Sequence, residues 1–341
     1  NIPDIKVVHS AYCGCFGRVN NTSSADCKNH LNIVFFGNLW RKLNRKILAS
    51  TLFKADVKWL NRAGYYGSAS VGARVKWNFQ KGENILHEVT PIHLEYNYLL
   101  STSERFEQLM SENPALYESL RDKLVPSIEY AFTWTSPKVQ KHQGRISLYT
   151  KQALQFQKYT ADYSHMLRVS PRSQLVVRGY LGFIWNYGNN NAPYSDLFAS
   201  GGANSIRAFG VRGIGPGSYN PAHSNYSYLD QVGNIRFECN VEYRFPIVAN
   251  LFGAVFLDAG NVWLTKEDQA RPGGHFQWKN LGKELALGTG AGLRYDLEFL
   301  VIRFDLGIGL HAPYDTGKSG YYNMPSFFKS LGYHFAVGYP F

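Results

Sequence analysis

The sequence lacks any long apolar run. Across its 341 residues, no uninterrupted apolar stretch approaches about eighteen residues, and the mean hydropathy is −0.28, which excludes a helical membrane protein. Methionine is also scarce (3), whereas Gly (32), Tyr (23) and Phe (22) are abundant. Aromatic and glycine enrichment over a polar average is typical of a membrane β-barrel, whose strands alternate lipid-facing apolar with lumen-facing polar residues. Because a soluble β-sandwich alternates in the same way, composition leaves both folds open.

Enzyme and metal motifs are missing as well. Neither G-x-S-x-G nor H-E-x-x-H occurs, and GIGPG (213–217) lacks the Lys-Ser/Thr pair with which a P-loop grips phosphate. Cys13, Cys15 and Cys27 have no fourth ligand at finger-like spacing, so we expect ordinary thiols, no metal and no cofactor. The sequence therefore gives no support to an enzyme.

The net charge of +11 raises the question of nucleic-acid binding. The Lys and Arg residues are spread along the chain, and the densest cluster, Arg41 to Lys46, has no recognisable binding fold around it. We therefore expect no nucleic-acid partner. The chain begins with Asn and shows no signal peptide, so we expect a mature chain or a fragment.

From about residue 50, the sequence breaks into segments with period-two alternation, separated by turn residues. These segments are longer than the usual strand of about five or six residues, and they suit tilted strands crossing a bilayer, which need about nine to eleven. The twelve predicted strands are 50–62, 64–80, 90–101, 124–136, 144–157, 159–170, 173–187, 231–245, 250–264, 284–297, 299–310 and 332–341.

The C-terminal strands decide between sandwich and barrel. In LALGTGAGLRYDL (285–297), Leu293 and Tyr295 share an apolar face, and Arg294 and Asp296 lie mid-strand on the other. The last segment, GYHFAVGYPF (332–341), alternates aromatics onto one face up to the final residue. Such a strand would be an exposed, sticky edge in a soluble protein, but it is the closing strand of a membrane barrel. We therefore predict an all-β, antiparallel transmembrane β-barrel.

One segment, TSERFEQLMSENPALYESLRDKL (102–124), breaks the β pattern. Its apolar residues follow helical spacing, with capping-type Ser and Asn residues before each turn. We interpret it as a helical insertion in a long loop, a surface cover with no function of its own. The residues with helical spacing are Phe106, Leu109, Met110, Leu116 and Leu120.

A long loop at 188–230 separates two predicted strands. A loop of this length is functional or disordered, and its apolar residues, such as Phe198 and Ile214, argue against disorder. It contains GGANSIRAFGVRGIGPGSY (201–219), and we predict that it folds into the barrel lumen. Glycines would let its backbone pass close to the wall; they include Gly201, Gly202, Gly215 and Gly217.

Two carboxylates are candidate partners for this loop. Alternation places Glu242 of FECNVEYRFP and Asp258 of VFLDAGNVW on the inward, polar faces of the next two strands. A mid-strand carboxylate is costly unless a cation meets it. Arg207 is the natural partner because its planar guanidinium can engage two carboxylates at once. Arg212 has no predicted role.

These motifs, in this order, resemble the BamA/TamA superfamily of outer-membrane assembly barrels (the bacterial surface antigen barrel domain) over about residues 50–341. Members carry a (V/I)RG(F/Y) loop motif, an acid on the following strand and F-x-D-x-G on the strand after it. The matching residues are Ile206, Arg207 and Phe209 for the loop, Glu242 for the acid, and Phe256, Asp258 and Gly260 for the third motif. Ala208 departs from the usual Gly and adds a methyl group near the barrel wall. Tyr339 and Phe341 resemble the C-terminal assembly signal of bacterial outer-membrane proteins.

The resemblance implies a barrel of sixteen strands preceded by POTRA repeats. Because only about twelve strands are visible and residues 1–49 remain unassigned, we expect a fragment that lacks the POTRA domains and the first strands. The implied function is a non-enzymatic assembly, insertion or translocation factor of the Gram-negative outer membrane, with the Arg207 loop braced by lumen carboxylates. Implied partners are outer-membrane lipids and lipopolysaccharide, client outer-membrane or secreted polypeptides, and accessory lipoproteins. A passive pore or surface structural barrel, and the barrel domain of a lipase fusion, remain alternatives.

Overall fold

A computed structural model describes residues 5–13, 27–36, 50–62, 66–112, 114–136, 141–188, 190–220 and 231–340. Cys15, the basic cluster Arg41 to Lys46 and the terminal Phe341 lie outside the described residues, so the expectations stated for them stay predictions.

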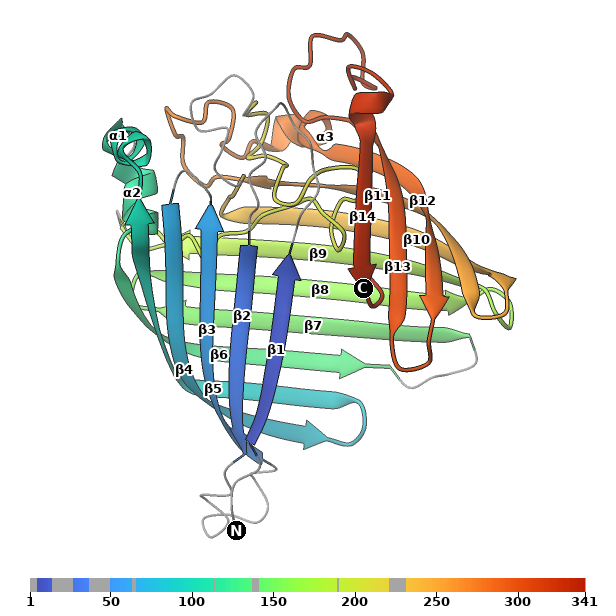
Figure 1. Cartoon of the computed structure of the whole chain (residues 1–341), viewed down its shortest axis with the longest axis horizontal. Coiled ribbons are helices and arrows are strands. Elements are labelled where there is room, and N and C mark those ends of the chain that lie inside the picture. Colours follow the sequence, from blue (N-terminus) through green and yellow to red (C-terminus); the bar gives the residue numbers. More distant parts are fainter. Residues whose placement is uncertain are drawn as a thin grey trace. The chain divides into compact units, whose positions relative to one another are not determined.

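The described residues form fourteen strands in one antiparallel sheet, in which each strand is hydrogen-bonded to the next along the chain (Figure 1). The order is linear, with β1 and β14 at its ends. All twelve predicted strands are present. The segment 1–49, for which no strand was predicted, contributes two more, β1 and β2. The strands are β1 (Ile5–Cys13), β2 (Cys27–Phe36), β3 (Ser50–Arg62), β4 (Tyr66–Lys81), β5 (Ile85–Thr102), β6 (Lys123–Thr135), β7 (His142–Ala153), β8 (Phe156–Arg168), β9 (Gln174–Asn186), β10 (Ile235–Val248), β11 (Leu251–Trp263), β12 (Ala286–Asp296), β13 (Val301–His311) and β14 (Leu331–Val337).

Burial along the strands is inverted relative to a soluble sheet. On β13, Arg303 and Asp305 are fully buried, whereas Phe304 between them is 45% exposed. On β11, Asp258 is fully buried and its neighbour Leu257 is 45% exposed. Successive residues of a strand point to opposite faces. One face is therefore apolar and open, and the other is charged and covered, as expected of strands that face lipid outward and a polar interior inward.

Helices are few and short. Between β5 and β6 lie α1 (Glu104–Glu112) and α2 (Pro114–Leu120), within the stretch predicted as helical. Phe106, Met110 and Leu120 are buried, and the backbone N–H of Phe106 donates to Ser103 Oγ at 3.3 Å. The remaining described helices are α3 (Leu281–Glu284) and the 3-10 helices η2 (Trp278–Asn280) and η3 (Phe328–Ser330). No helix among the described residues is both long enough and apolar enough to cross a membrane.

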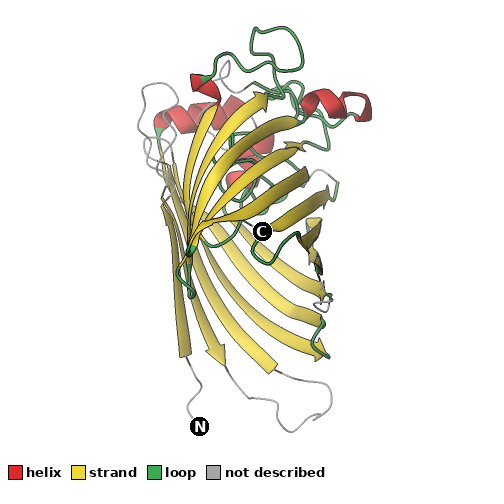
Figure 2. Cartoon of the chain, turned by 90° about the vertical axis from the view of Figure 1, so that its right-hand side faces the viewer, coloured by secondary structure: helices red, strands yellow, loops and turns green. Residues whose placement is uncertain are grey.

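Two compact units divide the chain. Unit 1 comprises 1–134, 147–159 and 184–196, and unit 2 comprises 135–146, 160–183 and 197–341. In unit 2, short and long connections alternate at opposite ends of the C-terminal strands (Figure 2). Residues 249–250 and 297–300 form short turns at one end, and 264–285 and 312–330 form long connections at the other.

Candidate functional site

The loop after β9 packs within unit 2 around an apolar cluster. Ile206 and Ile214 are fully buried, and the N–H of Phe209 donates to the carbonyl of Ile206 at 3.1 Å in a tight turn at the loop tip. The cluster comprises Ile206, Ala208, Phe209 and Ile214 of the loop with Ala286 and Ala312 of the wall, and Tyr314 and Met324 pack against it. The described part of the loop is therefore folded, with its tip held against β12 to β14.

Arg207 is fully buried and engages both predicted carboxylates. Its Nε and Nη2 donate to the two oxygens of Asp258 at 2.8 and 2.9 Å, its Nη1 donates to Glu242, and its backbone N–H reaches Asp258 Oδ2 at 3.1 Å. The guanidinium carbon lies 3.5 Å from the ring centroid of Phe256. Burial would lower the pKa of Arg207, but the hydrogen bond and charge of Asp258, with Glu242, outweigh burial and raise it. The loop tip therefore carries a permanent positive charge, which the carboxylates of β10 and β11 neutralise.

The ion pair is part of a larger buried network that the sequence did not predict. Arg244 Nε donates to Glu242 at 2.6 Å, and Arg294 bridges Glu242 at 3.2 Å and Asp305 at 2.6 Å. Arg303 lies 3.4 Å from Asp305 and donates back to the loop, to the carbonyl of Ala203 at 2.8 Å. The loop is thus tied to β10, β11 and β13 by charge, and β12 supplies Arg294 as a link.

The unusual Ala208 faces a wall thinned by glycine. A Cβ on Gly288 of β12 would lie 2.4 Å from the Cβ of Ala208, and one on Gly307 of β13 would lie 2.3 Å from the Arg207 carbonyl oxygen. On β14, Nε2 of His334 lies 2.8 Å from the same carbonyl oxygen. The extra methyl of Ala208 therefore fits because the facing wall residue has no side chain.

Residues 127–341 match the family model of the Omp85 superfamily domain. The chain belongs to the Omp85 superfamily. It is accordingly a β-barrel protein of the bacterial outer membrane.

Solved structures of similar fold include BamA and CdiB proteins. BamA from Haemophilus ducreyi lacking POTRA domains 1–3 has a TM-score of 0.64 at 14% identity, over 99% of this chain and 70% of that one. CdiB from Acinetobacter baumannii has a TM-score of 0.56 at 13% identity, over 92% of this chain and 50% of that one. CdiB from Escherichia coli gives 0.53 at 13% identity, over 92% and 52%. No curated protein sequence matches the chain significantly.

The remaining motif residues of this Omp85 chain support the loop. Gly201, Gly202, Gly215 and Gly217 all have positive φ, between 53° and 100°, a region that favours glycine. Arg212 also has a positive φ, of 56°, and its carbonyl accepts from the N–H of Gln231 at 2.9 Å. The four glycines therefore shape the loop backbone, and Arg212 helps to hold its outgoing end.

A second polar cluster lies at the base of the loop and was not predicted from the sequence. The hydroxyls of Ser200 and Ser205 both donate to the fully buried Glu238 of β10, which also pairs with Arg236 at 2.7 Å. Asn240 Nδ2 donates to the carbonyl of Ser205 at 2.9 Å and to Asp258 Oδ1 at 3.0 Å. The signal was available, since Glu238 and Asn240 share the polar face of β10 with Glu242.

In unit 1, the start of the same loop is anchored with the opposite charge arrangement. Asp196 comes from the loop, and Lys151 of β7 donates to its carboxylate at 2.8 Å. Lys158 of β8 donates to the Asp196 carbonyl at 2.6 Å and lies 3.5 Å from its carboxylate. Burial would raise the pKa of Asp196, but the charges of Lys151 and Lys158 outweigh it and hold the pKa below its usual value.

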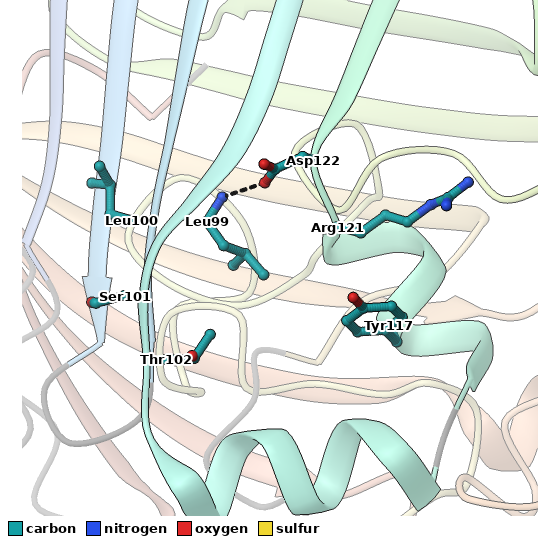
Figure 3. Close-up of a pocket in the computed structure, with 7 residues that line it drawn as sticks. All are labelled: Leu99, Leu100, Ser101, Thr102, Tyr117, Arg121 and Asp122. Carbon is teal, nitrogen blue, oxygen red and sulfur yellow. Dashed lines mark hydrogen bonds between the residues drawn. The ribbon is translucent and has the colours of Figure 1, made fainter.

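Two further features are the position of Tyr339 and a pocket in unit 1. Tyr339, predicted as part of a C-terminal signal, lies with its ring centroid 4.3 Å from the guanidinium carbon of Arg244 and so contacts the ion-pair network. Unit 1 contains a pocket of about 480 Å³ between the end of β5, α2 and the two residues that follow α2, with Leu99 N–H donating to Asp122 at 2.9 Å across it (Figure 3). None of the predicted site residues lines this pocket. Its lining is Leu99, Leu100, Ser101, Thr102, Tyr117, Arg121 and Asp122.

Proposed function

We propose that the chain is the barrel part of an outer-membrane assembly, insertion or translocation factor that acts on outer-membrane or secreted polypeptides and is not an enzyme. The observation that carries the proposal is the bidentate attachment of Arg207 to Asp258, with Glu242 as its second acid. Membership of the Omp85 superfamily supports it, and the fold is similar to that of BamA.

The role we infer for the loop is to brace the wall formed by β10 to β14. Its arginine cancels the charge of acids on β10 and β11, and its backbone contacts β13 and β14 through Gly307 and His334. Clients, lipids and accessory lipoproteins are the partners we propose. They follow from the family rather than from a contact in this chain.

A passive pore is the competing proposal, and the apolar cluster at the loop tip argues against it. An open channel needs a water-filled interior, whereas Ile206 and Ile214 are fully buried beside Ala286 and Ala312. A loop that is held against the wall favours a protein that acts on polypeptides. It argues against a protein that conducts solutes through the barrel.

Depletion in the host tests the proposal. We expect the levels of other outer-membrane barrels, or of a secreted client, to fall, and Arg207→Ala to reach the membrane but fail to restore them. Single-channel recording supplies the contrast, since a passive pore would give a steady open conductance in the wild type. Normal client levels after depletion, together with such a conductance, would establish the pore instead.

A further inference from the structure

Two 3-10 turns in unit 2 expose a large ring beside a lysine. In η2 the indole of Trp278 is 81% exposed and Lys279 follows it, and in η3 the ring of Phe328 is 84% exposed and Lys329 follows it. Aromatic rings of this size are usually covered in a folded protein. The repetition of ring and cation on two separate connections indicates a shared purpose.

Both turns lie at the long-connection end of their strands. Residues 264–285 lead from β11 into β12 and 312–330 lead from β13 into β14, and β12 and β14 are both neighbours of β13 (Figure 1). Outer-membrane barrels keep short turns on the periplasmic side and long loops on the outside. The two turns therefore lie on the outer side of the membrane, where η3 directly precedes β14 and η2 is followed by α3 and then β12.

The apolar surface of η3 continues into the lipid-facing face of β14. Phe327 and Phe328 lie four and three positions before the start of the strand, and Tyr333, Phe335 and Val337 are its exposed apolar residues. Aromatic rings at this level of a barrel contact the boundary between acyl chains and headgroups. The rings thus extend a surface that already faces lipid. We therefore infer that lipid is the partner that contacts them.

Along the chain, the residues of the two turns carry more positive than negative charge. Lys279, Lys283 and Lys329 are exposed, and the one acid in 278–285 is Glu284. Glu284 is buried and accepts from Trp263 Nε1 at 2.6 Å, and burial raises its pKa. Residues 325–332 contain no acid. An anionic headgroup is the complement of this surface.

We propose that η2 and η3, with Lys283, form a binding site for the phosphate groups of the outer-leaflet glycolipid, with Trp278 and Phe328 against its acyl chains. This site specifies one of the lipid partners named in the proposed function, but its test is separate from that of client handling, because lipid binding is measured on the purified chain without any client.

Native mass spectrometry of the purified full chain in detergent tests the site, with bisphosphorylated lipid A as the probe and phosphate-free lipid A as its counterpart. Each lysine near an anionic lipid surface contributes about fivefold in affinity. We therefore expect the triple variant K279Q/K283Q/K329Q to bind bisphosphorylated lipid A about a hundredfold more weakly. W278A/F328A should weaken binding of both lipids, because it removes the apolar contact.

The matched control removes three cations from the short-turn end of unit 2, where Lys141, Arg168 and Arg172 are exposed. K141Q/R168Q/R172Q should bind lipid A as the wild type does. Equal binding of the two lipids by the wild type, or unchanged binding by the lysine variant, would overturn the site. A dimer that W278A/F328A dissociates would assign the surface to a second copy of the chain.

Discussion

Arg207 attaches the tip of the loop to β10 and β11. It neutralises Asp258 and Glu242, which are both fully buried, and it is itself fully buried. We expect Arg207→Ala to cost about 3–5 kcal/mol, since it removes the cation that pairs with the buried Asp258 and one of the cations around the buried Glu242. Arg207→Lys should recover only part of this loss, because an ammonium cannot form the two parallel hydrogen bonds to Asp258. Urea titration of the refolded barrel, followed by its mobility on unheated gels, measures both.

Lys318→Gln is the control for these variants, since Lys318 is exposed on the 312–330 connection. Its unfolding midpoint should equal that of the wild type. Protease sensitivity of residues 200–214 that stays the same in Arg207→Ala would contradict the pairing.

Ala208 and Gly288 form a size-matched pair at the loop tip. A methyl on Gly288 would lie 2.4 Å from the Ala208 Cβ, and its next contacts would be at 3.6 Å. We expect Gly288→Ala to destabilise the barrel by about 1–3 kcal/mol through overpacking. The double variant A208G/G288A should return close to wild-type stability, because the methyl group then moves from one side of the contact to the other. Absence of this rescue in the urea titration would show that the contact is not limiting.

Among elements, the long loop is anchored at two points of opposite polarity, and only one was predicted. Arg207 meets wall acids in unit 2, and Asp196 meets wall lysines in unit 1. The first was foreseeable because a mid-strand acid on a polar face needs a cation. The second was not, because Asp196 lies in the loop, where no alternation marks its carboxylate as facing Lys151 and Lys158.

The Asp196 anchor has a pH dependence with a definite sign. Its pKa is lower in the folded protein than in the unfolded chain, so the unfolded chain binds more protons between the two values. The stabilisation is therefore complete above the ordinary Asp pKa of about 4 and is lost as the pH falls through the folded value. We expect the cleavage of residues 190–200 to increase progressively below about pH 4, measured at each pH with a protease that is active there. In Asp196→Asn they should be cleavable at every pH.

Asp315→Asn is the comparison, because Asp315 is exposed and lies on a different connection. Its cleavage profile at 190–200 should follow that of the wild type. Wild-type cleavage that is the same at pH 3 and pH 7 would rule out the anchor.

Strand prediction succeeded where alternation is regular and failed where it is interrupted. The segments 231–245 and 299–310 show a clean two-residue period, and β10 and β13 lie there. β1 (IKVVHSAYC) places Val7 beside Val8, which breaks the two-residue period. Its pairing with β2 is a contact between two segments, and the pattern within either segment alone does not predict it. The charged network around Asp305 was missed for the same reason, since it depends on the register of β12 against β13.

At the scale of the whole molecule, the inverted burial separates a membrane protein from a soluble sheet. In water, an exposed Leu257 beside a buried Asp258 would leave apolar surface uncovered and a charge desolvated. In a bilayer the same arrangement is favourable, since Leu257 meets lipid and Asp258 meets Arg207.

Leu257→Lys tests this inversion, because Leu257 is the middle residue of β11 (Leu251–Trp263) and is 45% exposed. In a bilayer we expect the lysine to cost about 2–4 kcal/mol in the free energy of unfolding, since it lies near the midplane. On the surface of a soluble sheet, the same change would stay within about 0.5 kcal/mol. Refolding into phosphatidylcholine vesicles and urea titration distinguish the two. Ser319→Lys, on an exposed connection, gives the baseline for an added charge, and a Leu257→Lys midpoint equal to it would place this face in water.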